Sequence, residues 1–180
     1  MKVKKTPRNA PGGTPATQTL SQAGIAFTIH SFDSEPSGAR SPNANSGYGL
    51  AAASALGVEH DRVFKTLVIS LQGGQHDMAV AVVPVTRQVS LKGLANTLGA
   101  KRAELLDPTT AERITGYVIG GISPLGQRRQ LPTVIDESAL GWDTIFVSAG
   151  RRGSDIEVDP ADLIRVLQAA TADISESSWK

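Results

Sequence analysis

The clearest strand in the sequence is Val63-Phe64-Lys65-Thr66-Leu67-Val68-Ile69-Ser70-Leu71, a mostly apolar run rich in β-branched residues. Gly73-Gly74 follows it, and a second apolar run extends from Met78 to Val85. Two apolar runs joined by a connection that contains glycine are typical of a β-hairpin. We therefore expect an antiparallel hairpin over this region.

Helices are indicated by their first residues. A hydroxyl or carboxylate side chain followed by proline favours a helix N-terminus, and this pattern occurs at Thr14-Pro15, Asp107-Pro108 and Asp159-Pro160. Ser90 is a further N-cap candidate, for a helix that extends to Leu98. An alanine-rich helix is expected over 50–56. Further strands are expected over 25–30, 117–119, 133–136, 144–148 and 155–158.

The order of these elements indicates the fold class. Hairpins and short helices are interleaved without regular βαβ spacing, which favours an α+β fold with a mixed, mainly antiparallel sheet. The length of 180 residues and the apolar share of 40 % suit one domain. We expect a flexible basic arm over residues 1–14, a domain over 15–170 and a polar tail over 171–180. The Ser-, Pro-, Asn- and Gly-rich segment 34–47 is expected to be a lid or an insertion.

Charge and cysteine content exclude several classes of function. The net charge is +1, but four basic residues precede residue 9, and the remaining 14 basic and 17 acidic residues give a net charge of −3. Any contact with RNA must therefore be local, at a pair such as Lys101-Arg102, Arg128-Arg129 or Arg151-Arg152, although such pairs are usually solvated loop charges. The absence of cysteine excludes disulfides, thiolate metal sites and a cysteine nucleophile.

No apolar segment is long enough for a membrane span, and no apolar stretch follows the basic start as it would in an export signal. We therefore expect a cytoplasmic protein without membrane contacts.

Lys65 is the first candidate site residue. The two-residue period of a strand places it on one face with Val63, Leu67 and Ile69. A lysine among apolar neighbours loses hydration and needs an anion, a carbonyl partner or a route to water. The alternative is a lysine near a strand end whose amine extends outward to solvent.

Two glycine-rich segments are further candidates. In Gly120-Gly121-Ile122-Ser123-Pro124-Leu125-Gly126, a ligand could approach backbone N–H groups closely, although such loops are more often structural turns. In Val147 to Asp155, a strand ends in small residues and returns through a basic turn. Ser148 and Asp155 would then lie at the mouth of a site, with the arginines near phosphates. The alternative is a hairpin whose arginines face solvent.

Several familiar catalytic patterns are missing. His30, His60 and His76 fall at a strand end, a helix–strand connection and a hairpin turn, where surface histidines are common. No pair has the spacing of zinc ligands, and no Gly-x-Ser-x-Gly motif is present. We therefore expect no metal, no cofactor and no serine triad.

Three segments together resemble the YbaK family: Phe64-Lys65-Thr66-Leu67, Gly116 to Gln127 and Gly150-Arg151-Arg152-Gly153. This family comprises Cys-tRNA(Pro) deacylases related to the editing domain of bacterial prolyl-tRNA synthetases, and the match extends over roughly residues 15–170. The resemblance implies a barrel-like mixed sheet surrounded by short helices. It also implies hydrolysis of mischarged aminoacyl-tRNA, with tRNA(Pro) and prolyl-tRNA synthetase as partners.

The resemblance also implies roles for individual residues. Lys65 would orient the terminal adenosine or its phosphate, with Thr66 beside it. Gly121 would contact the aminoacyl end through backbone N–H groups, and Ser148 and Asp155 would line the pocket. The remaining substrate contacts implied are Phe32, Tyr48, Gly120, Ile122, Ser123 and Pro124, with tRNA phosphates at Arg151 and Arg152.

The sequence departs from the family pattern in two places. Phe32 stands where relatives often have tyrosine, so a hydroxyl contact there is lost. The 34–47 segment is longer than in the best-known members, and Tyr48 falls where they carry another aromatic residue.

The family is thought to use the thiol of the substrate's own cysteine as nucleophile. Such an enzyme needs positioning groups and oxyanion donors rather than a nucleophile–base pair of its own. The absence of a convincing pair in this sequence fits that mechanism. Two alternatives remain: a deacylase for Ala-tRNA(Pro) or another small mischarged residue, and a non-catalytic module that binds tRNA or the synthetase.

Overall fold

The structure, a computed structural model, describes residues 4–6, 13–33 and 44–177, with the backbone alone for 4–6 and 44–46. Five α-helices occur in these ranges: α1 (Pro15–Gln22), α2 (Ala44–Leu56), α3 (Leu91–Thr97), α4 (Pro108–Thr115) and α5 (Pro160–Leu167). The described residues also form two 3-10 helices, η1 (His60–Arg62) before β3 and η2 (Glu137–Gly141) after β7. The strands are β1 (Lys4–Thr6), β2 (Phe27–Ser31), β3 (Phe64–Gln72), β4 (Met78–Pro84), β5 (Arg87–Val89), β6 (Arg102–Leu105), β7 (Thr133–Asp136), β8 (Ile145–Arg151), β9 (Ser154–Val158), β10 (Ala170–Ala172) and β11 (Ser175–Ser177).

The expected N-caps are confirmed. The side chains of Thr14, Ser90, Asp107 and Asp159 each accept a hydrogen bond from a backbone N–H two or three residues further on. These bonds satisfy donors that have no partner within the helix. The first residue of four helices could therefore be predicted from local chemistry alone.

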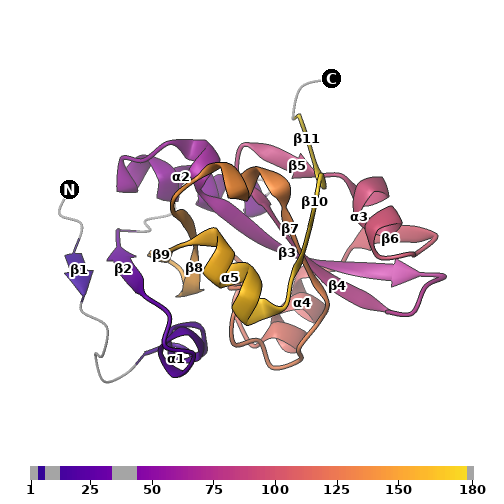
Figure 1. The fold of residues 1–180 in the computed structure, drawn as a ribbon, viewed down its shortest axis with the longest axis horizontal. Coiled ribbons are helices and arrows are strands. Elements are labelled where there is room, and N and C mark those ends of the chain that lie inside the picture. Colours follow the sequence, from indigo (N-terminus) through magenta and orange to yellow (C-terminus); the bar gives the residue numbers. More distant parts are fainter. Residues whose placement is uncertain (1–3, 7–12, 34–43, 178–180) are drawn as a thin grey trace.

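The expected hairpin is β3–β4, paired in antiparallel register from Phe64↔Pro84 to Ser70↔Met78. It lies inside a five-stranded sheet of order β10-β7-β4-β3-β6, in which β7 runs parallel to both β4 and β10. A four-stranded antiparallel sheet has the order β1-β2-β9-β8, and β11 pairs with β5. In Figure 1 the turn of the hairpin projects on the side of the molecule opposite β1 and β2.

The mixed, mainly antiparallel α+β architecture is confirmed, but the described strands form three sheets that do not close into a barrel. A single parallel bridge, Val63↔Phe146, connects the start of β3 with β8. Without continuous pairing between these two sheets, one edge of β3 is left open beyond this bridge.

Strand alternation gives β3 two buried faces. Phe64 and Val68 pack in the larger core together with α1, α4, α5, β8 and β9. Leu67 and Ile69 pack on the other face of the sheet, against Leu94 of α3. The central strand therefore separates two apolar clusters, and a polar residue in it must face a cavity or an end of the sheet.

Several sequence-based expectations were wrong. Residues 117–119 do not form a strand; they belong to an irregular loop in which Tyr117 is buried and its hydroxyl donates to the Leu125 carbonyl at 2.6 Å. Helix α2 begins at Ala44 instead of residue 50, inside the segment expected to be irregular. The remainder of that segment, 34–43, lies outside the described residues.

Both chain ends contribute strands that periodicity did not indicate. Within the expected arm, β1 pairs with β2 through Lys5↔His30 and its neighbours. Within the expected tail, β10 and β11 flank Ile174, which is completely buried. Three-residue strands are too short to show an alternating pattern. No helix in the described part of the chain combines the length and apolar character needed to cross a membrane.

Candidate active site

A cavity of about 100 Å³ lies beside the open edge of β3, between α2, β8, β9 and the loop that follows α4. A single water needs about 10–15 Å³ on this measure, so the cavity accepts several water-sized groups. Its lining includes eight of the residues that the sequence singled out: Phe32, Tyr48, Lys65, Thr66, Gly120, Ile122, Ser148 and Asp155. These residues come from five separate parts of the chain.

Lys65 is half-buried in β3 and lines this cavity. Burial lowers the pKa of its amine below the usual value for lysine, because the charged form loses hydration. No carboxylate within the described residues forms an ion pair with it. The amine is therefore available to an anion or a carbonyl oxygen that enters the cavity.

Asp155 supplies the second titratable group. It lies in β9 opposite His30 of β2 and Ser148 of β8, and 8 % of its surface is exposed. Burial raises the pKa of its carboxyl group to about 7, since the site offers too little solvation for the anion. Like Lys65, it has no ion-pair partner among the described residues.

The cavity lining therefore contains one basic residue, Lys65, and two acidic ones, Asp33 and Asp155, and Lys65 forms an ion pair with neither. The same lining includes one serine, Ser148, whose Oγ accepts the N–H of Gly150 at 3.2 Å. The lining contains neither histidine nor cysteine. The arrangement can hold a ligand that carries both a cation and a carbonyl or phosphate group, and it offers no nucleophile–base pair of the serine-hydrolase kind.

A local irregularity shapes the β8 side of the cavity. The register of β8 with β9 shifts between Ser148 and Arg151, which forms a bulge next to the site. Gly150 within it has φ of +93°, and a Cβ there would lie 2.6 Å from the ring of Tyr117. A larger residue at this position would be both strained and obstructed.

Part of the glycine-rich loop has a different position from the one expected. The N–H of Gly121 donates to the carbonyl of Val118 at 2.9 Å, so it is not directed at a ligand. Ser123 is completely buried, and its Oγ accepts the N–H of Leu125 at 3.3 Å. Pro124 is also buried, and neither residue belongs to the cavity lining. The loop reaches the cavity through Gly120 and Ile122 instead.

Gly121 matters for a different reason, which is close packing of two loops. A Cβ on it would lie 2.8 Å from the backbone carbonyl carbon of Arg151. Only glycine allows the loop after α4 to approach the β8–β9 turn so closely. This contact fixes the position of Gly120 and Ile122 relative to Ser148 and Asp155.

The two arginines of the turn are exposed and lie outside the cavity lining. Arg152 is held in place: its Nε donates to the Ile119 carbonyl at 2.7 Å, and its guanidinium lies 5.2 Å from the centre of the Tyr48 ring. A cation above the face of an aromatic ring is attracted to that ring. Arg152 therefore positions Tyr48 at the edge of the cavity, whereas Arg151 stays a candidate phosphate contact.

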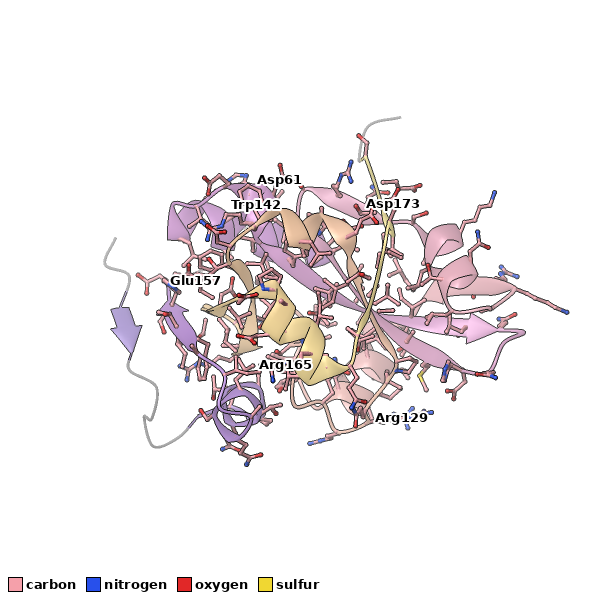
Figure 2. The ribbon with its side chains drawn as sticks, in the orientation of Figure 1. Asp61, Arg129, Trp142, Glu157, Arg165 and Asp173 are labelled. Atoms are coloured by element: carbon pink, nitrogen blue, oxygen red, sulfur yellow. The ribbon has the colours of Figure 1, made fainter. Side chains whose placement is uncertain are left out.

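His30 was expected at the surface, and this prediction was wrong. It is 7 % exposed, and its Nε2 lies 2.8 Å from Oε2 of Glu157, with its ring edge against Phe146. Partial burial would raise the pKa of Glu157, but hydrogen bonds from Thr144 and His30 and the charges of His30 and Arg62 lower it. Figure 2 shows Glu157 and Trp142 on the side of the molecule where Figure 1 labels β2.

Sequence reasoning named Tyr48 of α2 but missed the small residues of this helix that line the cavity. Gly49 and Ala52 line the cavity, and a Cβ on Gly49 would lie 2.3 Å from Cγ1 of Val85. The small residues of α2 let this helix lie close to the end of β4. The available signal was the three-residue spacing of Gly49 and Ala52, but this spacing is equally typical of a helix face that packs in the core. Asp33 also lines the cavity and had no pattern of its own, whereas Gly153 belongs to the motif Gly150-Arg151-Arg152-Gly153.

Comparison with known proteins identifies the family. A family model described as "Aminoacyl-tRNA editing domain" matches residues 49–166. The chain belongs to this family. The matched range of the editing domain contains every residue of the cavity lining except Phe32, Asp33 and Tyr48.

Two relatives illustrate the range of named activities among editing domains. The chain is 39 % identical over 125 residues to EbsC of Enterococcus faecalis, named as a candidate Cys-tRNA(Pro)/Cys-tRNA(Cys) deacylase, with 69 % of this chain and 75 % of that protein covered. It is 30 % identical over 106 residues to the multifunctional Ser/Thr-tRNA deacylase ProXp-y of Escherichia coli, with 58 % and 64 % covered.

Solved structures confirm the fold of the editing domain. A crystal structure described as that of a candidate trans-editing enzyme for prolyl-tRNA synthetase superposes with a TM-score of 0.75, at 22 % identity, over 94 % of this chain and 99 % of the other. The fold class inferred from sequence is therefore shared with that structure.

Proposed function

We propose that this chain hydrolyses the ester of mischarged Cys-tRNA(Pro), acting in trans beside prolyl-tRNA synthetase in the cytoplasm. The observation that carries the proposal is the cavity in which Lys65 and Asp155 lie without an ion-pair partner among the described residues. An aminoacyl ester presents an ammonium group and a carbonyl oxygen within a few bonds of each other. The carboxylate of Asp155 suits the ammonium, and the amine of Lys65 suits the carbonyl or a nearby phosphate.

The proposed chemistry uses the thiol of the substrate. Its sulfur attacks the ester carbonyl carbon, the carbon–oxygen bond to the tRNA breaks, and the proton lost by the thiol goes to the terminal ribose oxygen. Water then opens the cyclic thioester to free cysteine. The protein has to hold the reacting atoms together and stabilise the oxyanion, which fits a cavity without a nucleophile–base pair.

The oxyanion donors proposed here differ from those expected from sequence. Since the N–H of Gly121 is already bonded to Val118, the ammonium of Lys65 takes this role, assisted by the N–H groups of Gly120 and Ile122. Neither of these two N–H groups has a hydrogen-bond acceptor among the described residues.

A second candidate substrate class is tRNA charged with serine or threonine, because the Escherichia coli relative is named as a Ser/Thr-tRNA deacylase. Hydroxyl side chains are close in size to cysteine and would fit the same small cavity. Ala-tRNA(Pro) is a further small substrate, and a non-catalytic tRNA- or synthetase-binding module is the alternative from another class.

A substrate panel tests the proposal. Purified protein is incubated with Cys-, Ser-, Thr-, Ala- and Pro-tRNA(Pro), with and without prolyl-tRNA synthetase, and release of the amino acid is followed. We expect Cys-tRNA(Pro) to be hydrolysed fastest and Pro-tRNA(Pro) to be spared. Equal rates for Cys- and Ala-tRNA(Pro) would contradict the thiol mechanism, and binding without any hydrolysis would favour the module.

A further inference from the structure

The backbone turn at the edge of the cavity, Val118-Ile119-Gly120-Gly121, has a defined type. The N–H of Gly121 donates to the carbonyl of Val118 at 2.9 Å, which closes a four-residue β-turn. Gly120, the third residue, has φ of +85°, whereas Ile119, the second residue, has negative φ. Positive φ at the third position alone is the mark of a type II turn, and it explains why glycine occupies this position.

The peptide between Ile119 and Gly120 has two possible orientations. Type I and type II turns differ mainly by a rotation of this central peptide by roughly 180°. The rotation keeps the closing hydrogen bond but reverses the directions of the Ile119 carbonyl and the Gly120 N–H. Because C=O and N–H point in opposite directions across a trans peptide, the group that holds the carbonyl also determines where the N–H points.

Arg152, in the turn between β8 and β9, holds this carbonyl. Its Nε donates to the oxygen of Ile119 at 2.7 Å, and its guanidinium also lies against the ring of Tyr48. No carboxylate in the described part of the chain forms an ion pair with Arg152. The guanidinium thus meets a peptide oxygen, and its charge strengthens that hydrogen bond and polarises the N–H at the other side of the same peptide.

Glu112 of α4 holds Ile119 from its other side. The Oε1 of Glu112 accepts the N–H of Ile119 at 2.8 Å, so both backbone polar groups of Ile119 are bonded to side chains of other elements. The close packing of Gly121 against the backbone of Arg151 brings these elements together. Ile119 therefore has its N–H and its carbonyl fixed independently.

The direction of the Gly120 N–H follows from these contacts. Arg152 is exposed and lies outside the cavity lining, whereas Gly120 belongs to the lining. Since the carbonyl of Ile119 is directed at Arg152, the N–H of Gly120 is directed away from it, to the cavity side. A Cβ on Gly120 would lie 3.0 Å from the ring of Tyr48, so the residue is also confined by packing.

We propose that Arg152 and Glu112 are positioning residues of the editing site. Together they hold the Ile119–Gly120 peptide in the type II orientation, in which the Gly120 N–H meets the oxyanion of the ester. The inference rests on the proposed function, because the oxyanion belongs to that substrate. Rotation toward type I would turn the Ile119 carbonyl to the cavity, where its oxygen repels an oxyanion. Arg152 then serves this turn rather than a tRNA phosphate.

A lysine variant distinguishes positioning from neutralisation of a phosphate. Arg152→Lys keeps the charge but loses the planar guanidinium that bonds the Ile119 carbonyl and covers Tyr48. On the aminoacyl-tRNA that the wild type cleaves, we expect kcat to fall by at least about tenfold and KM to change by less than about twofold. Arg165→Lys is the matched control, at an exposed arginine outside the cavity lining, and should keep the wild-type kinetics.

A phosphate contact would give a different result, because lysine also neutralises phosphates. Unchanged kinetics in Arg152→Lys, or a raised KM with an unchanged kcat, would overturn the proposal for Arg152 and leave the proposed function intact.

Two variants test Glu112. Glu112→Ala removes the acceptor of the Ile119 N–H, and we expect kcat to fall by about tenfold. Glu112→Gln should restore most of this loss, because the side-chain oxygen of glutamine accepts the same hydrogen bond. Equal kcat values for the alanine and glutamine variants would overturn the role of Glu112.

A measurement without substrate separates this proposal from the proposed function. In a type II turn the Hα of Ile119 lies beside the amide proton of Gly120, and in a type I turn it does not. We therefore expect a strong nuclear Overhauser effect between these two protons in the full-length wild type and in Arg165→Lys, and a weaker one in Arg152→Lys. An effect that is weak in the wild type, or equally strong in all three proteins, would overturn the turn assignment.

The two proposals can thus fail separately. If the wild type cleaves no aminoacyl-tRNA but the Overhauser effects change as expected, the deacylase proposal fails and the control of the turn by Arg152 stands. If the wild type cleaves Cys-tRNA(Pro) and Arg152→Lys is equally fast, the deacylase proposal stands and the positioning role fails.

Discussion

At the scale of single residues, the site depends on two ionisable side chains that share a cavity without neutralising each other. Desolvation lowers the pKa of Lys65 and raises the pKa of Asp155 to about 7. Both shifts favour the uncharged form in the empty cavity. A ligand that supplies opposite charges would therefore gain two interactions that the protein alone does not make.

Asp155 should make the stability of the fold depend on pH. Its pKa is about 7 in the folded chain and near 3.8 when unfolded, so between these values the folded state holds a proton that the unfolded state lacks. The free energy of unfolding should then fall as the pH rises from about 4 to about 7, by up to about 1.4 kcal/mol per pH unit from this residue. Asp155→Asn should remove this slope, as measured by urea denaturation at several pH values.

The exposed Asp173 provides the control for that experiment. Asp173→Asn should leave the pH dependence of stability unchanged. Parallel stability curves for the wild type and Asp155→Asn would mean that Asp155 ionises normally in the folded protein.

The sequence predicted Lys65 more securely than the residues around it. A lysine within an apolar strand is visible in one segment, because strand periodicity is local. The Thr66 hydroxyl, which is buried and has no hydrogen-bond partner in the described part of the chain, and the burial of Asp155 both depend on strands from other parts of the chain. The Gly121 N–H was assigned to the substrate because a glycine-rich loop indicates close approach, but the sequence does not show that the approaching group is the backbone of Arg151.

At the scale of elements, the site is built by two loops held in close contact. Gly121→Ala would place a Cβ 2.8 Å from the Arg151 backbone, which cannot move aside as a flexible side chain could. We expect a loss of about 1–3 kcal/mol in the free energy of unfolding, together with slower hydrolysis, because Gly120 and Ile122 would shift. Urea denaturation and editing kinetics on the same preparation measure both effects.

Gly141→Ala is the matched control, since a Cβ there has no atom within 4 Å. The free energy of unfolding should change by no more than about 0.5 kcal/mol in this variant. If the two alanine variants were equally stable and equally active, the close approach of the two loops would have no role.

Elements with strong local signals were predicted well, and short ones were not. The four capped helices and the β3–β4 hairpin are specified by side chains within a few residues of their ends. In contrast, β1, β5, β10 and β11 are three residues long and form only because a partner strand lies beside them. Helix α2 extends into a segment rich in Ser, Asn and Gly, whose composition does not favour a helix, and only Gly49 within it is shown to lie close to Val85.

At the scale of the whole molecule, the C-terminal strands complete the apolar cluster on the α3 side of the five-stranded sheet. The completely buried Ile174 packs with Leu94 and Val134, its carbonyl accepts the Ser90 N–H at 2.7 Å, and its own N–H donates to Asp136 at 3.1 Å. The segment expected to be a polar tail thus holds the start of α3 in place. Ile174→Ala should lower the free energy of unfolding by about 2–5 kcal/mol in thermal or urea denaturation.

Leu140→Ala is the comparison for that variant, because Leu140 is 55 % exposed. This variant should lose no more than about 0.5 kcal/mol in the free energy of unfolding. Similar stability for the two variants would show that the C-terminal strands contribute little to the folded state.

The measurement that tests the central claim most directly is the rate of Cys-tRNA(Pro) hydrolysis by Lys65→Ala, compared with Arg165→Ala, in which an exposed basic side chain outside the cavity lining is removed. Loss of an oxyanion-stabilising group typically costs about 10²–10³ in rate, so Lys65→Ala should lose at least about 100-fold while its fold and stability persist. Arg165→Ala should match the wild type. A correctly folded Lys65→Ala protein that hydrolyses Cys-tRNA(Pro) as fast as the wild type would contradict the account.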